Sequence, residues 1–286
     1  MISRSEIIIE AKDLSYCYPG EEDNLSPVLS GINLTVCRGE YIVLLGPNGS
    51  GKTTLLKLLN ALLAPSDGEV LVEGISTVVE ENIPLIRRSC GMIFQNPDNQ
   101  LVATTVEEDI AFGLENMALP SVEIQQRVAE VARLLKLDKL LQQQPHLLSG
   151  GEKQRTAIAG VLVMQPKCLL MDEPTAMLDP AGRRDVIDTV RSLNCEQGIA
   201  VVHVTHFPEE AAFADRVIIL SEGCLIREGK PEKILTDLSL LHELGLEGTA
   251  SSELANLLRE DGFPLPPEIL FNRELVNSIC SLERKS

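Results

Sequence analysis

A glycine-rich loop between an apolar run and a leucine-rich run constrains this chain most strongly. Residues 41–45 are apolar, as in a buried strand, and residues 54–63 carry the leucine spacing of a helix. A strand, a glycine-rich loop and a helix together predict a phosphate site, because the glycines let backbone N–H groups turn toward a phosphate at the positive helix end. The loop follows the pattern G-x-x-x-x-G-K-[ST] through Gly46, Pro47, Asn48, Gly49, Ser50, Gly51, Lys52 and Thr53.

The side chains of this phosphate loop have separate expected roles. Lys52 is placed to reach the β- and γ-phosphates of a nucleotide, and the hydroxyl of Thr53 suits Mg²⁺. Thr54 adds a second hydroxyl near the phosphates. An ordinary strand-to-helix turn is the alternative, but it does not explain all the fixed residues of the pattern. We therefore expect the chain to bind a nucleotide with Mg²⁺.

Two acids end another apolar run. Residues 168–171 are apolar and are followed by Asp172 and Glu173. At the end of a buried strand beside a phosphate loop, the first acid suits Mg²⁺ coordination through water. The second is placed to orient and deprotonate an attacking water. Asp172 is the predicted metal residue and Glu173 the predicted general base.

A second anion site is expected where the helical run of residues 153–163 begins. Ser149, Gly150, Gly151 and Glu152 precede this run directly. A serine hydroxyl and free N–H groups at a helix start bind anions. One chain thus has two predicted phosphate-binding helix starts and one acid pair.

Composition limits the class of protein. The chain has 286 residues, 44% of them hydrophobic and 3% aromatic, with no Trp and a net charge of −17. This charge argues against binding nucleic acid through its phosphates. Seven scattered cysteines without a C-x-x-C pair are typical of a reducing compartment. We expect no signal peptide and no transmembrane segment, since residues 1–13 are mixed and charged and no apolar run is long enough.

The pattern along the chain predicts an α/β fold with a small second unit. We expect a parallel core sheet, an antiparallel β layer, a helical subdomain inserted at about residues 96–164, and a small α-rich C-terminal extension. The expected domains are residues 1–240 and 241–286. A turn-rich loop is expected at residues 19–24. The expected strands are residues 7–9, 32–36, 41–45, 70–72, 92–94, 168–171, 200–205, 217–220 and 224–227.

The order of these motifs resembles the ATP-binding cassette (ABC) ATPases, which are P-loop NTPases. The order runs from the phosphate loop through Gln95 and the Leu-Ser-Gly-Gly segment to the acid-ended strand and His206. The resemblance covers about residues 6–240. It implies a Mg·ATP-hydrolysing domain.

In that family two domains face head to tail. The resemblance implies that Ser149, Gly150 and Gly151 cap the γ-phosphate held by the other domain's phosphate loop. Glu152 stands where the wider family commonly has Gln, and this change removes no phosphate donor. Asp179 lies in the segment that meets the partner subunit.

The resemblance also implies roles for three further side chains. Gln95 senses Mg²⁺ and the water while linking to the membrane partner, and His206 contacts the γ-phosphate. Tyr18 stacks on adenine, with Tyr16 as the competing choice.

Longer stretches resemble the ATPases of energy-coupling factor transporters. These are residues 94–100, 103–113 and 153–162. The resemblance implies ATP-driven uptake of vitamins or of cobalt and nickel ions. Its partners are a second ATPase, a transmembrane coupling protein (T component) and a substrate-binding membrane subunit (S component). The chain is then peripheral, on the cytoplasmic face of the cell membrane, and its extension helps to hold two ATPases together.

Several alternatives stay open. Met177 resembles one of the two paralogous ATPase types and residues 173–176 the other, and either a homodimer or a heterodimer is compatible. A soluble ABC-type clamp on nucleic acid or ribosomes is opposed by the charge and by the single cassette. A P-loop kinase would have no use for the Leu-Ser-Gly-Gly helix.

The acidic residues 107–109 have two interpretations. They form either a solvated helix start or one wall of a groove for an arginine-bearing coupling helix.

Overall fold

Two sheets share the centre of the molecule. The structure, a computed structural model, describes residues 6–19 and 27–283, so most of the predicted loop at 19–24 lies outside the described residues. The larger sheet has the order β10-β9-β3-β8-β7-β6. Its strands from β9 to β6 are parallel, and β10 runs antiparallel to β9. Its bounds are β3 (Tyr41–Leu45), β6 (Cys90–Ile93), β7 (Cys168–Asp172), β8 (Ala200–Val204), β9 (Arg216–Ser221) and β10 (Cys224–Gly229).

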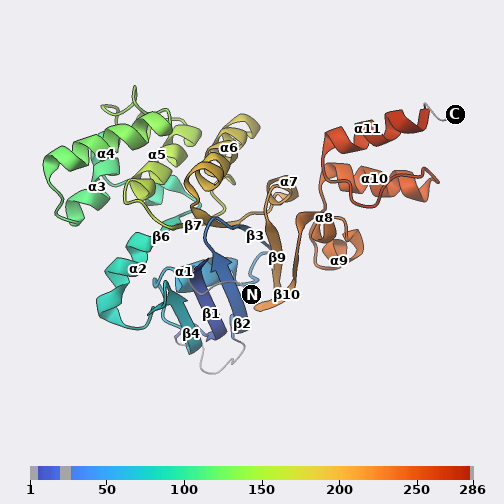
Figure 1. Cartoon of the computed structure of the whole chain (residues 1–286), viewed down its shortest axis with the longest axis horizontal. Helices are drawn as coiled ribbons and strands as arrows, with labels where there is room; N and C mark the ends of the chain where they lie inside the picture. Colours follow the sequence, from blue (N-terminus) through green and yellow to red (C-terminus); the bar gives the residue numbers. More distant parts are fainter. Residues whose placement is uncertain (1–5, 20–26, 284–286) are drawn as a thin grey trace.

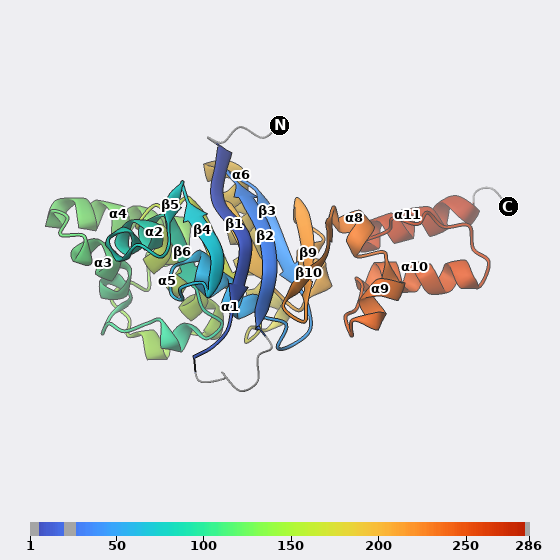
Figure 2. The ribbon, with the colours of Figure 1, turned by 90° about the horizontal axis from the view of Figure 1, so that it is seen from below.

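The smaller sheet is antiparallel and lies beside the first (Figures 1 and 2). Its order is β2-β1-β4-β5, so the predicted antiparallel layer and parallel core are both confirmed. The first strand is longer than expected, because buried residues recur after Ile9 at Ala11, Leu14 and Tyr16, with a register shift between Ala11 and Leu14. The bounds are β1 (Ile7–Tyr16), β2 (Leu29–Cys37), β4 (Asp67–Val72) and β5 (Ile75–Ser76).

Strand β3 divides the hydrophobic core in two. Tyr41, Val43 and Leu45 belong to a cluster with the helices of one side, whereas Ile42 and Leu44 belong to a cluster with β1, β2 and α1. This alternation follows from the pleat, which sends successive side chains to opposite faces. All five residues of β3 are buried, as expected for a parallel strand covered on both faces.

Helices cover both faces of the parallel sheet, and α3, α4 and α5 form in the chain between β6 and β7 (Figure 1). Within the expected helical subdomain, residues 139–143 form turns and a bend rather than a helix. The long helix α6 was not expected, because only four of its residues are buried and the rest are largely polar. The bounds are α1 (Lys52–Leu59), η2 (Glu80–Asn82), α2 (Ile83–Ser89), η3 (Pro97–Asn99), α3 (Val106–Asn116), α4 (Ser121–Leu134), η4 (Pro145–Leu147), α5 (Gly150–Leu162), α6 (Pro180–Gln197), α7 (Pro208–Ala211), α8 (Pro231–Ile234), α9 (Leu238–Glu243), α10 (Ala250–Glu260) and α11 (Asn272–Glu283).

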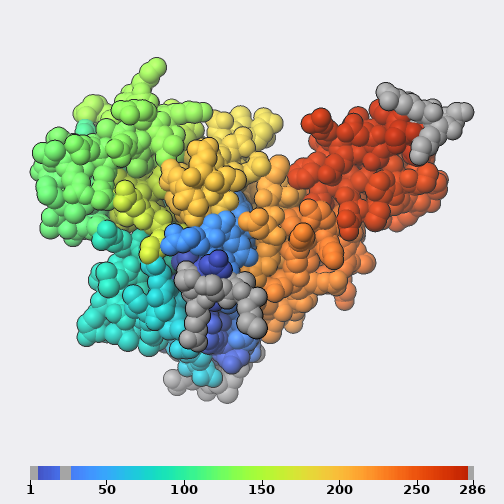
Figure 3. Space-filling view, viewed as in Figure 1, coloured from blue at the N-terminus to red at the C-terminus, as the bar shows by residue number. Residues whose placement is uncertain are grey.

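The last two helices protrude from the body of the molecule (Figure 3). They enclose a small apolar cluster of their own, made by Ala255, Leu265, Ile269 and Leu275. By contrast, Leu241 packs into the main core. The expected boundary between residues 240 and 241 falls inside α9, and the division into two domains stays a prediction. No helix in residues 6–19 and 27–283 is long and apolar enough to cross a membrane.

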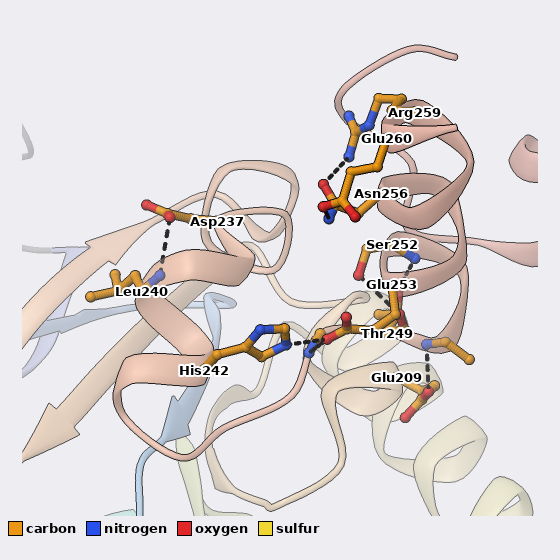
Figure 4. Close-up of polar contacts among 12 residues, drawn as sticks. Glu209, Asp237, Leu240, His242, Thr249, Ser252, Glu253, Asn256, Arg259 and Glu260 are labelled. Atoms are coloured by element: carbon orange, nitrogen blue, oxygen red, sulfur yellow. Dashed lines mark hydrogen bonds and ion pairs between the residues drawn. The ribbon is translucent and has the colours of Figure 1, made fainter. Parts of the chain in front are cut away.

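Polar contacts join the protruding helices to the body (Figure 4). The carboxylate of Glu209, on α7, accepts a hydrogen bond of 3.3 Å from the backbone N–H of Ala250 at the start of α10. Glu253 accepts one of 2.9 Å from the N–H of Gly248 and lies 2.9 Å from Nε2 of His242. The body and the extension therefore meet at α7, α9 and the first turn of α10.

One buried histidine makes stability depend on pH. His203 is fully buried in β8, and its Nδ1 lies 3.0 Å from the hydroxyl of Tyr41. Burial lowers the pKa of His203 from its ordinary 6.5 to about 3. The unfolded chain therefore binds this proton first as the pH falls. The stabilising effect of the neutral ring is complete above pH 6.5 and is lost between pH 6.5 and about 3.

We expect the wild type to lose about 1.4 kcal/mol of unfolding free energy from this group between roughly pH 7.5 and pH 5.5. The variant His203→Gln should lack this loss, whatever its stability at neutral pH. Urea unfolding of both proteins at the two pH values measures the difference. Burial raises the pKa of Glu210, so this residue makes the unfolding free energy rise as the pH falls. Both proteins contain Glu210, so its contribution is present in both. Equal pH dependence in the two proteins would contradict the assignment.

Candidate active site

The phosphate loop connects β3 to α1, and close packing restricts two of its positions to glycine. A Cβ at Gly46 would lie 2.0 Å from the carbonyl oxygen of Leu220, and one at Gly51 would lie 2.9 Å from that of Val28. Gly51 also has φ of 101°. No side chain caps α1, so the N–H groups of its first turn stay available to an anion.

The remaining loop residues surround the same position. Lys52 is buried, and its ammonium donates to the carbonyl oxygens of Gly46 at 2.8 Å and Pro47 at 2.9 Å. Burial lowers the pKa of Lys52. Asn48 and Gly49 are exposed at the tip of the loop. The loop therefore holds its cation in place with its own carbonyl groups.

The turn between β9 and β10 also touches the loop. The N–H of Gly223 donates to the carbonyl oxygen of Ser50 at 3.2 Å. The hydroxyl of Ser50 is buried and has no hydrogen-bond partner in the described part of the chain. A backbone hydrogen bond thus joins the hairpin to the phosphate loop.

Thr53 and Asp172 lie side by side. The hydroxyl of Thr53 donates to both carboxylate oxygens of Asp172, at 3.0 and 2.9 Å. Asp172 is buried, and burial raises the pKa of its carboxyl. Hydroxyl and carboxylate oxygens are hard donors of the kind that Mg²⁺ prefers, so this pair fits the predicted metal.

The carboxylate of Glu173 joins two other predicted residues. Gln95 donates from Nε2 to Oε2 of Glu173 at 2.9 Å, and Nε2 of His206 is in close contact with Oε1. Glu173 has φ of 48°, a left-handed conformation that costs a non-glycine residue about 1 kcal/mol. The three residues come from different segments and meet around one carboxylate.

Tyr18, rather than Tyr16, has an accessible ring. Tyr18 is 38% exposed, while Tyr16 is 6% exposed in the core. The hydroxyl of Tyr18 lies 3.1 Å from that of Thr54, the buried residue next to Thr53. The two tyrosine rings meet edge to face, with centroids 5.0 Å apart. Burial leaves Tyr18 as the better placed of the two for a flat ligand.

The signature segment (Ser149, Gly150, Gly151, Glu152) begins α5. Ser149 caps the helix, and its N–H and hydroxyl both donate to Oε2 of Glu152, at 2.8 and 2.7 Å. These bonds lower the pKa of Glu152. The acid that departs from the usual Gln thus completes a capping box and orients the serine.

The signature segment is separate from the phosphate loop within one chain. In residues 6–19 and 27–283 no hydrogen bond or ion pair joins the two, and Figure 1 shows α5 away from α1. Instead, a Cβ on Gly151 would contact Gly182 near the start of α6 at 3.7 Å. Asp179 caps α6 by accepting from the N–H of Gly182 at 2.9 Å, and both Asp179 and Met177 are exposed. The two segments expected to meet a partner subunit therefore lie against each other.

A groove of about 920 Å³ lies between α2, α3 and α5. Its walls include the exposed apolar side chains of Leu85 and Phe112. Gln100, on the groove wall, accepts from the N–H of Phe94 at 3.3 Å and donates to the carbonyl of Ala157 at 3.3 Å. Phe94 directly precedes Gln95, so one hydrogen bond links the groove residue Gln100 to the segment that contacts Glu173. No periodicity in the sequence singles out these residues, because they come from three helices.

The three acidic residues 107–109 have different surroundings in the structure. Glu108 forms the capping box of α3 with Thr105, and Glu107 accepts a 2.5 Å hydrogen bond from Gln142. Only Asp109 lines the groove, and its carboxylate accepts from backbone N–H groups nearby. The idea that Glu107 and Glu108 form a groove wall is therefore not supported.

A phosphate loop, an acid pair at the end of a neighbouring strand and a capped signature helix define an ATPase of the ATP-binding cassette class. The comparisons with known proteins agree. The profile of the family described as ABC transporter matches residues 29–176. The energy-coupling factor transporter ATP-binding protein EcfA1 of Symbiobacterium thermophilum is 50% identical over 96% of this chain and 97% of its own length.

Solved structures give the same result. The structure of cbiO1 from Clostridium perfringens, described as part of the ABC transporter complex cbiONQ, has a TM-score of 0.76 and 35% identity, covering 89% of this chain and 99% of its own. The dimeric cassette MJ0796 bound to ADP and Pi has a TM-score of 0.71 and 32% identity, covering 78% and 99%. The chain belongs to the ABC transporter ATPases and, among them, to the energy-coupling factor transporter ATP-binding proteins. Members of this class bind and hydrolyse ATP.

Proposed function

We propose that this chain hydrolyses Mg·ATP at a site shared with a second ATPase and thereby powers uptake of a vitamin or a transition-metal ion through membrane partners. The observation that carries the proposal is the carboxylate of Glu173, which contacts Gln95 and His206 next to the Thr53–Asp172 pair. A carboxylate, an amide and an imidazole that meet beside a phosphate loop support the proposal. Phosphoryl transfer needs such positioning more than covalent chemistry.

Each residue has one role in this proposal. Lys52 and the N–H groups of α1 hold the β- and γ-phosphates, and Thr53 and Asp172 hold the metal, which neutralises charge on the phosphates when bound. Glu173 orients and deprotonates the water, while His206 donates to the γ-phosphate. The ring of Tyr18 stacks on adenine.

The second half of the site comes from another subunit. Ser149 and Gly151 are exposed or half-buried at the start of α5, a helix that lies away from α1 in Figure 1. We expect them to cap the γ-phosphate bound to a partner, with Asp179 at the same interface. A dimeric relative is known in MJ0796, which supports a paired arrangement. The partner is either a second copy or a paralogous ATPase, and the extension of α10 and α11 adds contact between the two.

The groove between α2, α3 and α5 is the proposed seat of a helix of the transmembrane coupling protein. Its apolar walls and its link through Gln100 to Phe94 would transmit a movement of that helix to Gln95. The chain would then lie on the cytoplasmic face of the membrane. The substrate-binding subunit selects the cargo in this scheme.

We expect Phe112→Asp to weaken capture of the coupling protein at least ten-fold, because a carboxylate would replace half-exposed apolar surface in the groove. ATP binding should be unchanged, since Phe112 does not contact the Glu173 cluster. Val122→Asp is the matched control, because Val122 is similarly exposed on α4 but is not part of the groove wall. Mass spectrometry of the detergent-solubilised complex measures the amount of each subunit, and equal recovery with both variants would contradict the docking site.

A clamp on nucleic acid is the alternative function. The net charge of −17 opposes it, because such binding depends on cationic contacts with phosphates. Stable recovery of the chain with membrane subunits supports transport, and recovery with ribosomes or nucleic acid supports the clamp.

A further inference from the structure

The short helix α7 carries a buried carboxylate that contacts two catalytic segments at once. Glu210 is 5% exposed. Its Oε1 accepts a hydrogen bond of 2.7 Å from the hydroxyl of Thr175, and its Oε2 accepts one of 2.5 Å from the hydroxyl of Thr205. Thr175 lies two residues after Glu173, and Thr205 directly precedes His206. One side chain therefore joins the segment of the proposed base to the segment of the proposed γ-phosphate contact.

A second contact joins the chain around His206 to the start of α6. The guanidinium of Arg183, in the first turns of α6, lies 3.3 Å from the ring centroid of Phe207, which directly follows His206. Its Nε is 3.8 Å from Oε1 of Glu210. A cation over an aromatic face at this distance is attractive. The start of α6 and the chain around His206 are thus held together by one carboxylate and one guanidinium.

Burial raises the pKa of Glu210 overall, while the two hydroxyl donors and Arg183 stabilise its charged form. Two hydroxyl donors and the guanidinium of Arg183 face Glu210, and Nε2 of the buried His203 lies 3.4 Å from Oε2. Burial alone would favour the protonated acid. A carboxylate that keeps two hydrogen bonds in the interior is costly to replace, because loss of one acceptor leaves a buried hydroxyl without a partner.

We infer that Glu210 is a positioning residue that fixes Glu173 and His206 relative to each other. It acts through its hydrogen bonds with Thr175 and Thr205. The backbone supports the same geometry, since the N–H of Glu173 donates to the carbonyl oxygen of Val204 at 3.0 Å. The inference rests on the roles proposed above for Glu173 and His206.

The test compares Glu210→Gln with Glu209→Gln in the full-length ATPase assembly. Glutamine keeps the shape of the side chain but has one acceptor oxygen and no charge. Glu209 is the matched control, because it lies on the same helix, is exposed, and has no contact with Thr175 or Thr205 among the described residues. We expect Glu210→Gln to lower kcat about ten-fold to a hundred-fold, the size of effect of misplacing reacting groups by about 1 Å. Its KM for ATP and its stoichiometry of ATPγS binding should stay within about two-fold of the control.

A double-mutant cycle separates positioning from general destabilisation. Thr175→Val and Thr205→Val each remove one donor while keeping side-chain shape, and Thr205→Val also removes the acceptor of the Phe207 N–H. If both act through Glu210, combining either with Glu210→Gln should lower kcat no more than about two-fold beyond Glu210→Gln alone. Additive losses of kcat in the double mutants would overturn the inference. So would a lower stoichiometry of ATPγS binding combined with a normal kcat for each bound nucleotide, because that result indicates unfolded protein.

Glu173→Gln and His206→Ala, assayed in parallel, separate this inference from the proposed function. If both lose hydrolysis while Glu210→Gln keeps it, only the positioning role of Glu210 is wrong. If Glu173→Gln hydrolyses ATP normally, the proposed function fails irrespective of Glu210.

Discussion

Replacement of Glu173 by Gln is expected to lower the rate of ATP hydrolysis about a hundred-fold to ten-thousand-fold, the usual contribution of a positioned general base. The amide keeps the size of the side chain, and it preserves an oxygen that can accept from Nε2 of Gln95 or from His206. Binding of ATP should therefore persist. Since hydrolysis normally reopens the site, the variant should accumulate with ATP as a closed dimer.

Two measurements check this expectation together. Phosphate release gives the rate, and light scattering with and without ATP gives the mass of the assembly. Glu152→Gln is a useful control, because it also neutralises an acid but lies in the signature capping box. A near-normal rate for Glu173→Gln would exclude Glu173 as the base. If Glu173→Gln hydrolyses ATP slowly but does not accumulate as a dimer, bound ATP alone is not sufficient to close the dimer.

The second large effect concerns the sharing of each site between chains. Lys52→Ala removes the cation from the phosphate loop, and Gly151→Asp adds a carboxylate to the signature segment. The backbone accepts this Asp, because a Cβ at Gly151 meets its nearest neighbour at 3.7 Å. Each variant alone should lose about a hundred-fold to a thousand-fold in rate. Mixing the two should restore part of the rate, because one site of a mixed dimer then has an intact loop and an intact signature.

The matched control places both substitutions in one chain and mixes it with wild type. Those mixed dimers have no intact site, so the rate should fall below that of wild type diluted with buffer. If cross-linking shows mixed dimers but the single variants fail to restore any rate, the sites are built within one chain. If the chain pairs only with a paralogue, the same substitutions are divided between the two proteins.

Motifs set by local chemistry could be predicted from the sequence. The phosphate loop needs glycines for close approach and a helix start for charge, so Gly46, Gly51 and Lys52 are recognisable without any tertiary information. Asp172 could be predicted because it ends a run of buried residues. The fold class followed in the same way, since continuous apolar runs predict strands covered on both faces.

Contacts between distant segments could not be predicted in this way. Glu210 accepts from Thr175, which is 35 residues away, and no periodicity in the sequence connects the two. An acid four residues after His206 was the one available signal. Helix α6 was missed because most of its residues are polar, although Asp179 and Pro180 form a typical helix start. The acidic residues before Ile110 were ambiguous, because a helix cap and a charged groove use the same side chains.

The hairpin turn between β9 and β10 has a practical consequence for anyone building reporter versions of this protein. Surface turns usually accept inserted tags and fluorophores. This turn does not have that freedom, because the N–H of Gly223 bonds to Ser50 and a Cβ at Gly223 would lie 2.5 Å from the carbonyl oxygen of Val28. An insertion there would move the nucleotide site itself. The bend after α10 is the better attachment point, since nothing lies within 4 Å of a Cβ built at Gly262.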